Sequence, residues 1–461
     1  MANLMGTMSV ALGALKNSQE ALDVTSNNIA NLNTVGYSRQ RANFAETDPV
    51  VFGRLQFGTG AQISNIQSIR DQALEFRINA ETQQQSGLNT FLAPMQQVQA
   101  TFNEAAGTGL QGAISGFFNS LSQLSTNPAN VPLRQNVLTA GQSMSAAFNN
   151  AASNLSNLRS SMDTQVPTTV QQINSLSQSI AELNLRISQS QAGGQQPGVL
   201  EDQRNEMIHK MAELVNISMV QGSNGAISIS TALGAALVVG GQSFNLQVAT
   251  NATTGMQEVQ ASNGTDLTAA INGGQLGGII RVRDQAIPDL QTKLDTLASG
   301  IANAVNTAHQ AGFDLNGAPG QKLFTVPVAV AGTAQTITMN ITDPAQVAAS
   351  LNGTVGDNAN ALALSNLQNQ TIVGGQKPVD FYSNTVLQLG MDIQQASSQS
   401  DTQSVVLQQL QTQRNSISGV SMDEEAANLV RFQRAYQAAA RVVNVIDEMT
   451  QTALNLGVGG A

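Results

Sequence analysis

The residue types that most often carry out chemistry are scarce in this chain, and their spacing does not assemble a site. Only two histidines are present, His209 and His309, on different predicted helices, and there is no cysteine. Neither histidine has a cysteine or a second histidine at metal-ligand spacing, so a structural zinc site is not expected. A surface or interhelical role is the ordinary expectation for each histidine.

The short motifs of catalysis and phosphate binding are also missing from the sequence. No G-x-S-x-G elbow precedes a predicted helix, and there is neither a P-loop nor a G-x-G-x-x-G after a strand. DLNG at residues 314–317 resembles the start of a calcium loop, but the acidic fifth position and the glutamate at position twelve are absent. This stretch is interpreted as a turn. We therefore expect no enzyme, no metal and no cofactor.

The composition points to a chain that packs against neutral polar surfaces. The formal net charge is −10, which argues against a nucleic-acid backbone or anionic lipid as partner. Only 11% of residues are charged, less than half of the usual ~25%. Neutral polar residues suit contacts between copies, because each buried unpaired charge is costly. Compositional drift is the alternative explanation.

Signals for membranes and cleaved leaders are not recognisable. No stretch approaches the roughly 18 apolar residues of a membrane span, so no membrane insertion is expected. The first residues lack both a basic n-region and a continuous apolar h-region. The chain is expected to be cytoplasmic, or exported by a route that leaves its N-terminus intact.

Both ends of the chain carry an apolar stripe at heptad spacing, which predicts one helix at each end. The N-terminal stripe is Leu4, Met8, Ala11, Leu15, Ser18, Leu22, Thr25 and Ile29. The C-terminal stripe is Leu429, Phe432, Tyr436, Ala439, Val443, Ile446, Thr450 and Ala453. Ser421 and Glu424 form a capping box before the second helix. An isolated amphipathic helix is marginal in water, so the two stripes should serve each other and then neighbouring subunits. Closure of one ordinary helical bundle is the alternative.

The segment SNNIANLNTVGYSRQ, residues 26–40, ends the N-terminal helix with a highly specified turn. Asn31 can satisfy backbone groups that are freed where the helix stops, and Gly36 permits a positive φ. Tyr37, Arg39 and Arg41 are expected to leave the core and meet acidic or carbonyl groups at a subunit boundary. The alternative for these three residues is an ordinary exposed turn.

The pattern between the ends predicts a mainly α fold with an inserted β domain, in the order helix, β, helix, β, helix. The expected packing is nested, with the terminal helices as a coiled-coil layer over a long helical bundle and a small distal β domain. Residues 1–41 and 416–461 would form the terminal coiled-coil domain. Residues 42–216, 282–312 and 357–415 would form the bundle. Residues 217–281 and 313–356 would form the outer β-rich domain.

Two terminal stretches resemble the signatures of the flagellar axial protein family, which comprises rod, hook and hook-associated proteins. These are TSNNIANLNTVGYSRQ at 25–40 and SGVSMDEEAANLVRFQRAYQAAARVVNVIDEM at 418–449. Rod and hook members usually carry Gly-Phe-Lys after the asparagines, whereas this chain has Gly-Tyr-Ser-Arg-Gln at 36–40, similar to the hook-associated branch. Residues 198–220 and 273–324 also resemble the body of that branch.

The resemblance implies a structural subunit at the junction between hook and filament, which polymerises through its terminal helices into a helical ring. The implied assembly residues are Leu4, Met8, Leu15, Leu22, Ile29, Asn31, Gly36, Tyr37, Arg39, Leu429, Phe432, Tyr436, Val443 and Ile446. Implied partners are hook protein, the next hook-associated protein on the filament side, and a cytosolic export chaperone. The chaperone would bind the C-terminal helix at Leu429, Val443, Ile446 and Leu454.

The implied location is the flagellum, reached by type III export without a cleaved signal peptide. Two alternatives remain open from the residues. One is a hook or distal-rod subunit, and the other is a non-flagellar exported coiled-coil protein.

Overall fold

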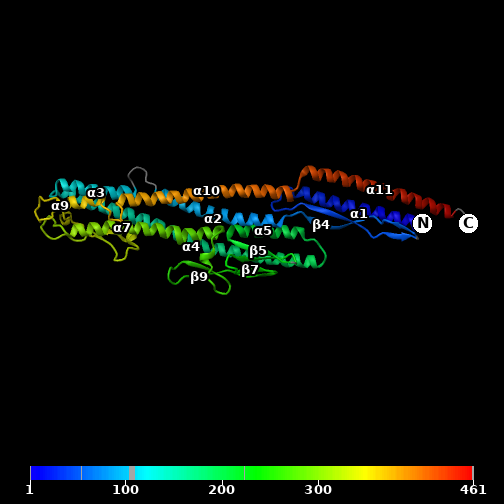
Figure 1. Ribbon diagram of the computed structural model, residues 1–461, viewed down its shortest axis with the longest axis horizontal. Helices are drawn as coiled ribbons and strands as arrows, with labels where there is room; N and C mark the ends of the chain where they lie inside the picture. The colour runs from blue at the N-terminus through cyan, green and yellow to red at the C-terminus, as the bar shows by residue number, and fades with distance from the viewer. Residues whose placement is uncertain (1, 53, 103–108, 223, 459–461) are drawn as a thin grey trace.

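The chain folds into a long rod in which both termini lie at one end (Figure 1). The structure is a computed structural model that describes residues 2–52, 54–102, 109–222 and 224–458. The first helix leads inward from the terminal end, the central segments run to the far end, and the last two helices return. The mainly α fold with small inserted sheets and paired terminal helices is confirmed.

The terminal helices are α1, Ala2–Ala30, and α11, Met422–Val458, and they pack along each other. Between α1 and the bundle, the chain forms a hairpin of β1, Gln40–Glu46, and β4, Ala61–Ser68. The two strands pair antiparallel with a bulge between Asn43 and Phe44. A smaller hairpin of β2, Val50–Phe52, and β3, Leu55–Phe57, extends from it. The hairpin contacts α1, so it forms a third side of the terminal layer.

The bundle is built from long helices around one continuous apolar core. Its members are α2 (Gln72–Phe102), α3 (Leu110–Thr126), α4 (Val131–Ala192), α5 (Gly198–Leu214), α6 (Gly274–Arg281), α7 (Ile287–Gln310), α9 (Ala359–Asn366) and α10 (Pro378–Ser418). The start of α4 has a physical cause, because the side chain of Asn130 accepts a hydrogen bond from the Leu133 amide at 3.1 Å. Between α6 and α7 lies one π-helical segment, Val282–Ala286.

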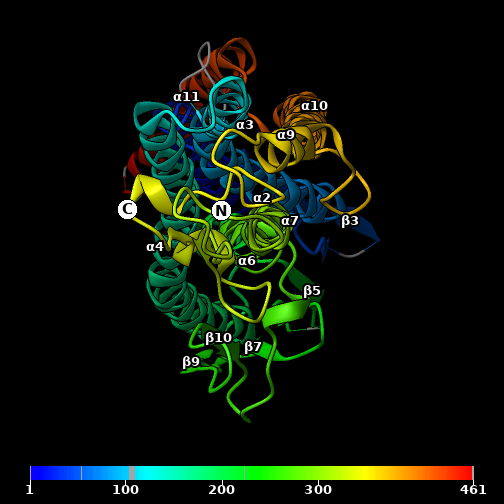
Figure 2. The same cartoon turned by 90° about the vertical axis from the view of Figure 1, so that its left-hand side faces the viewer.

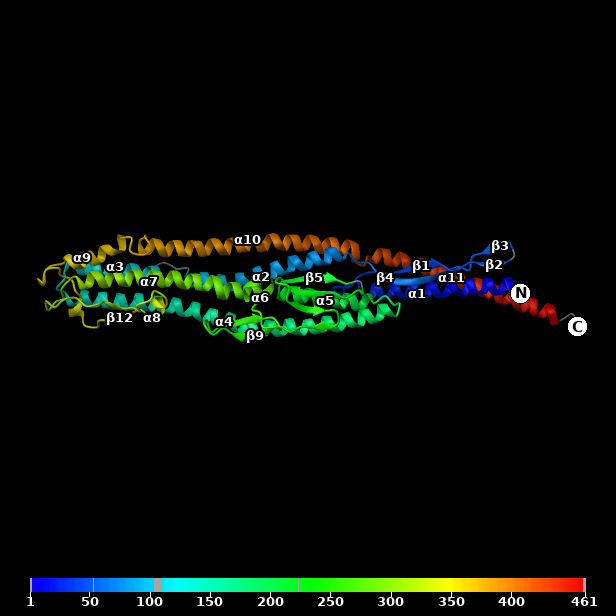
Figure 3. The same ribbon diagram turned by 60° about the horizontal axis from the view of Figure 1, so that its bottom comes forward.

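The first β-rich segment lies on one side of the bundle (Figure 2) and against its middle rather than at its far end (Figures 1 and 3). A four-stranded sheet has the order β5 (Ile217–Gln221), β6 (Ile227–Thr231), β7 (Ala236–Val239) and β8 (Gln242–Ser243). A separate pair consists of β9 (Gln247–Thr250) and β10 (Gln257–Gln260). The alternating burial of β6 shows that one face of the sheet rests on the bundle.

The second segment expected to be β-rich, 313–356, has little regular sheet. Within the described residues its strands are β11, Phe324–Thr325, and β12, Thr338–Met339, and a short helix α8, Thr333–Thr336, lies between them. This segment lies near the far end of the rod, apart from β5–β10 (Figure 3). The expectation of a β-rich segment was therefore wrong for most of residues 313–356. The two β segments also form separate sheets. In the second segment the paired strands are short, and side-chain hydrogen bonds attach this part of the chain to the bundle.

Buried His309 on α7 makes the clearest of these side-chain contacts. Its Nδ1 lies 2.5 Å from the Gln321 carbonyl oxygen, and its Nε2 accepts a hydrogen bond from the Ala348 amide at 2.8 Å. The ring is fully buried, and burial together with nearby Arg134 lowers the pKa of His309. Neutral His309 thus fastens two parts of the far-end segment to the bundle.

Candidate assembly interface

The apolar seam of α11 is the face that packs within the terminal pair. Ala439 and Ile446 are buried, and Leu429, Phe432, Tyr436 and Val443 are half-buried. Leu454, near the C-terminal end, is 55% exposed. The residues expected at the assembly interface of α11 are therefore partly covered inside one chain, whereas Leu454, which was expected only in the chaperone site, is exposed.

The buried face of α1 is wider than the expected stripe. Ala11, Ser18 and Thr25 of the stripe are buried, and its other members Leu4, Met8, Leu15, Leu22 and Ile29 are half-buried. Ala21, Val24 and Asn28, which lie outside the stripe, are buried as well. The wider face has a structural cause, since α1 contacts both α11 and the β1–β4 hairpin. A helix with two neighbours buries a wider arc than a simple heptad seam.

The β1–β4 hairpin contacts both terminal helices. The side chain of Asn17 on α1 accepts a hydrogen bond from the Ile63 amide at 3.2 Å and donates to the Ala61 carbonyl at 2.5 Å. The ring of Phe44 lies 6.3 Å, centroid to centroid, from that of Phe432 on α11. The hairpin therefore fixes the two helices relative to each other.

The turn after α1 is held by a single buried asparagine. The Asn28 amide nitrogen donates to the Gln40 carbonyl at 2.8 Å, and its oxygen accepts from the Gln40 amide at 2.9 Å and from the Tyr37 hydroxyl at 2.8 Å. Gly36 has φ +81°, the conformation expected for it. Asn31 caps locally, since its side chain donates to the Asn27 carbonyl at 3.0 Å. Burial first, then the negative charges of Asp202 and Glu425, raises the pKa of Tyr37 to about 12.

Arg39 joins the exit of α1 to the start of α11. Its Nε lies 2.7 Å from Oε1 of Glu425, which is 1% exposed, and its Nη1 contacts Glu424. The Arg39 amide also donates to the Ser418 carbonyl at 2.9 Å. These groups all belong to one chain, so Arg39 is engaged within its own subunit. The sequence had instead predicted that Arg39 meets such groups at a subunit boundary.

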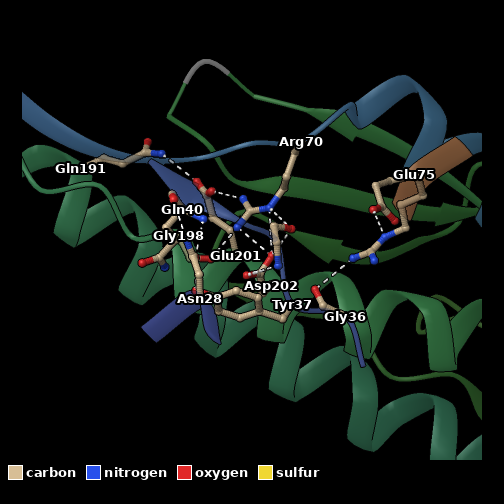
Figure 4. A network of polar contacts seen from close by, with 12 residues as sticks. Asn28, Gly36, Tyr37, Gln40, Arg70, Glu75, Gln191, Gly198, Glu201 and Asp202 are labelled. Atoms are coloured by element: carbon tan, nitrogen blue, oxygen red, sulfur yellow. Dashed lines mark hydrogen bonds and ion pairs between the residues drawn. The ribbon is translucent and has the colours of Figure 1, made fainter. Parts of the chain in front are cut away.

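A second buried cluster ties the same turn to the bundle (Figure 4). The Ser38 hydroxyl donates to Asp202 Oδ1 at 2.7 Å and its amide donates to Oδ2 at 3.1 Å. Arg70 lies 2.8 Å from the same carboxylate, contacts Glu201, and donates to the Gly198 carbonyl at 2.5 Å. Burial raises the pKa of Asp202, while Arg70 and Ser38 oppose that rise.

A third arginine, Arg414, completes this connection, which we call the joint: residues 36–40 with Arg70, Glu75, Asp202, Arg414 and Glu425. Arg414 on α10 lies 2.7 Å from Glu75 on α2 and donates to the Gly36 carbonyl at 3.0 Å. A cavity of about 520 Å³, lined by Arg414, Glu75 and the 31–37 turn among others, lies beside it. Among the side chains that the structure describes, none of α1 or α11 belongs to the main apolar core. Polar contacts rather than a shared core thus connect the terminal layer to the bundle.

Several joint residues gave no signal in the sequence. Glu425 was visible only as part of an acidic first turn, and Arg70, Glu75, Asp202 and Arg414 lie far apart along the chain. Their partnership depends on how the bundle folds. Among the described residues, no group of three or more His, Cys, Asp or Glu is placed to hold a metal ion.

Comparisons with known proteins agree along the whole chain. Residues 95–324 match the family model described as the flagellar hook-associated protein FlgK helical domain. Residues 8–37 match the flagella basal body rod protein model, and residues 411–456 match the C-terminal model of the flagellar basal body rod FlgEFG proteins. The two terminal models thus cover most of α1 and α11, and the FlgK model covers most of the segments between them.

Curated relatives carry one name. Flagellar hook-associated protein 1 of Bacillus subtilis is 30% identical, covering 98% of each chain. The protein of that name from Escherichia coli is 27% identical, over 97% of this chain and 98% of its own. The solved structure of the flagellar hook junction protein FlgK from Burkholderia pseudomallei has a TM-score of 0.68 at 18% identity, and covers 74% of this chain and 100% of its own. The chain belongs to the flagellar hook-associated protein 1 family and is a structural subunit of the bacterial flagellum.

Proposed function

We propose that this chain forms the junction between hook and filament by polymerising through α1 and α11 into a helical ring. The observation that carries the proposal is full-length similarity to hook-associated protein 1, combined with termini that meet at one end of the rod. The terminal family models alone would fit a rod or hook subunit equally well. The helical-domain model over residues 95–324 favours the hook-associated role.

Deletion of this gene alone tests the proposal by electron microscopy, with flagellin measured in the medium. Hooks without filaments, and flagellin lost as monomer, are the expected outcome. Absence of hooks would move the protein to the rod or hook. Normal flagella would contradict a flagellar junction role altogether.

The partners follow from this position. Hook protein would contact one side of the ring and the next hook-associated protein the other. Pull-down of each partner on assembled structures, with deletion of residues 422–461 as the comparison, tests whether α11 is needed for both contacts. Retention of both partners without α11 would contradict assembly through the terminal layer.

A cytosolic chaperone is proposed to cover the seam of α11 before export. Leu429, Val443 and Ile446 pack within the terminal pair, so the chaperone must bind before α1 does, whereas Leu454 is already accessible. An amphipathic helix in a groove is the expected binding mode. Titration of the purified chaperone with full chain and with a chain lacking residues 1–30 tests this order. Tighter binding to the shortened chain is expected, and equal affinities would contradict it.

Export is proposed to leave the N-terminus uncleaved. Within the part of the chain that is described, no helix combines the length and the hydropathy needed to cross a bilayer. Mass spectrometry of the protein shed into the medium should find α1 complete. Loss of the first residues by specific cleavage would contradict this part of the proposal.

A further inference from the structure

The terminal layer has a second apolar stripe, which is exposed within the described part of the chain. On α11, Ala435, Ala438, Val442, Val445 and Met449 recur at spacings of three and four, and all are exposed. Val445 is 53% and Met449 54% exposed. The seam towards α1 uses Ala439 and Ile446, on a neighbouring face of the same helix. A second stripe at helical period on the surface indicates a second helix partner.

The free face of α1 is also apolar towards the terminal end. Met5 is 76% and Leu12 50% exposed, on the side of α1 away from Ala21 and Val24. Nearer the joint, this side carries Lys16, Glu20 and Asp23 instead, so that its net charge is negative. The outer face of α1 therefore has an apolar half at the tip and an acidic half at the joint.

The outer face of α11 has the same division with the opposite charge. Its tip half holds Val442, Val445 and Met449, and its joint half holds Arg431 and Arg434. Within the described residues, neither arginine has an ion pair, although Arg431 lies 4.7 Å from the ring centroid of Phe432. In the same part of the chain, the ion pair of Glu20 is with its exposed neighbour Lys16, at 3.7 Å.

The two faces match in height because the helices run antiparallel from a common anchor. Asn28 bonds to Gln40, and Arg39, which is adjacent to Gln40, pairs with Glu425. Asn28 on α1 and Glu425 on α11 therefore lie at the same height along the rod. At about 1.5 Å rise per residue, Asp23 and Arg431 lie about 8–9 Å from that level. Leu12 and Val442 lie about 24–26 Å from it, and Met5 and Met449 about 35–36 Å.

We propose that the outer face of α11 in one copy packs against the outer face of α1 in the next copy, at the same height. This inference rests on the proposed function. Apolar halves then meet at the tip, and Arg431 and Arg434 meet Glu20 and Asp23 near the joint. A symmetric contact of α11 with α11 would instead oppose arginines, and α1 with α1 would oppose carboxylates. The contact is therefore heterologous and continues from copy to copy around a ring or helix.

Disulfide crosslinking tests the contact directly, because the chain contains no cysteine. A chain with Leu12→Cys and Val442→Cys is expressed in the gene-deletion strain, and isolated hook–filament structures are oxidised mildly. A ladder of linked chains on a non-reducing gel is expected. A disulfide inside one chain would give no ladder, so the readout is specific for neighbours.

The matched control replaces Val442→Cys by Asn444→Cys, which is also exposed but points to nearly the opposite side of α11. No ladder is expected from this pair. Two outcomes would overturn the lateral contact and leave the junction role intact. One is that filaments form but the Leu12→Cys, Val442→Cys chain gives no ladder, and the other is that both cysteine pairs give equal ladders. Normal flagella in the deletion strain would instead overturn the proposed function.

Charge reversal gives a second measurement that does not depend on cysteine chemistry. The variant Arg431→Glu with Arg434→Glu should still be exported. Most cells that carry it should lack filaments. Adding Glu20→Arg and Asp23→Arg in the same chain should restore filaments. Unchanged filament numbers in the first variant, or no recovery in the second when both chains are exported, would contradict the proposed pairing.

Discussion

At the scale of single residues, the joint depends on charges whose exposure differs sharply. Arg39 contacts two neighbouring carboxylates, of which Glu425 has 2% of its side chain exposed and Glu424 60%. An exposed ion pair contributes little to stability, whereas a buried carboxylate needs its partner. The turn at 36–40 is thus specified by its contacts inside the chain.

Neighbouring substitutions separate the two contacts. Glu425→Gln should lower the free energy of unfolding of the terminal layer by about 1–3 kcal/mol, because Arg39 loses a buried charged partner. Glu424→Gln should change it by less than ~1 kcal/mol. Hydrogen exchange of the α11 amides measures both. Equal effects of the two variants would show that burial of Glu425 does not matter.

His309 predicts a pH dependence at the opposite end of the rod. Burial, with Arg134 as a further cause and Asp314 opposing, lowers the pKa of His309 below its ordinary value. As the pH falls below ~6.5, His309 therefore binds a proton in the unfolded chain before it does so in the folded chain. The stabilisation from neutral His309 is fully present above that pH and is lost as pH falls towards the lowered pKa of the folded state.

Denaturant unfolding across this pH range is the measurement. Stability of the natural chain should decrease below about pH 6.5, by at most ~1.4 kcal/mol per pH unit from this group. The His309→Gln variant should be less stable at neutral pH, because the ring's contacts to Gln321 and Ala348 are lost, and should show a weaker decline. The same decline in both chains would rule out His309 as its source.

At the scale of elements, α11 carries two faces with different tasks. Ile446 is 5% exposed on the face towards α1, and its neighbour Val445 is 53% exposed on the outer stripe. Adjacent residues of one helix therefore belong to different contacts. The inner face holds the pair together, and the outer face is the one proposed to meet another copy.

Two alanine substitutions distinguish these tasks. Ile446→Ala should cost the terminal pair ~2–4 kcal/mol, since it removes a buried side chain and leaves a cavity. Val445→Ala should leave the free chain nearly unchanged, within about 0.5 kcal/mol. Hydrogen exchange of the α1 amides reports on the pair. A large loss of protection with Val445→Ala would mean that the outer face is not free in the single chain.

At the scale of the whole molecule, the bundle and the terminal layer have separate apolar interiors. The main core is formed by buried residues whose sequence positions run from Phe91 to Ala396. A small cluster of Leu74, Ile78 and Leu410 lies on the bundle side of the joint. The buried residues of α1 and α11 belong to neither. The connection between the two parts is polar, beside a cavity, and is therefore the place where their mutual orientation can change with least loss of apolar burial.

Truncation tests this separation. A chain of residues 70–415 should keep the cooperative thermal transition of the bundle near that of the full chain, because its apolar core is complete. Circular dichroism during heating measures it. A fall of many degrees would show that the terminal layer stabilises the bundle through the joint.

The sequence by itself determined the elements that depend on local pattern. Heptad spacing at Leu429, Phe432 and Ile446 predicted the inner face of α11, and Gly36 predicted a turn with positive φ. These features depend on backbone preference and on the helical repeat, which neighbouring residues specify. The pattern was less informative for residues 313–356, which were expected to be β-rich and whose described strands, β11 and β12, are short.

Only the tertiary structure decided which charges meet and where the small sheets lie. Ser38 and Asp202 are 164 positions apart, and Arg39 and Glu425 are 386 apart, so no local pattern links them. The hairpin also widens the buried arc of α1, which a single heptad stripe cannot anticipate. Contacts between distant segments arise from the path of the whole chain, and the joint is built almost entirely from such contacts.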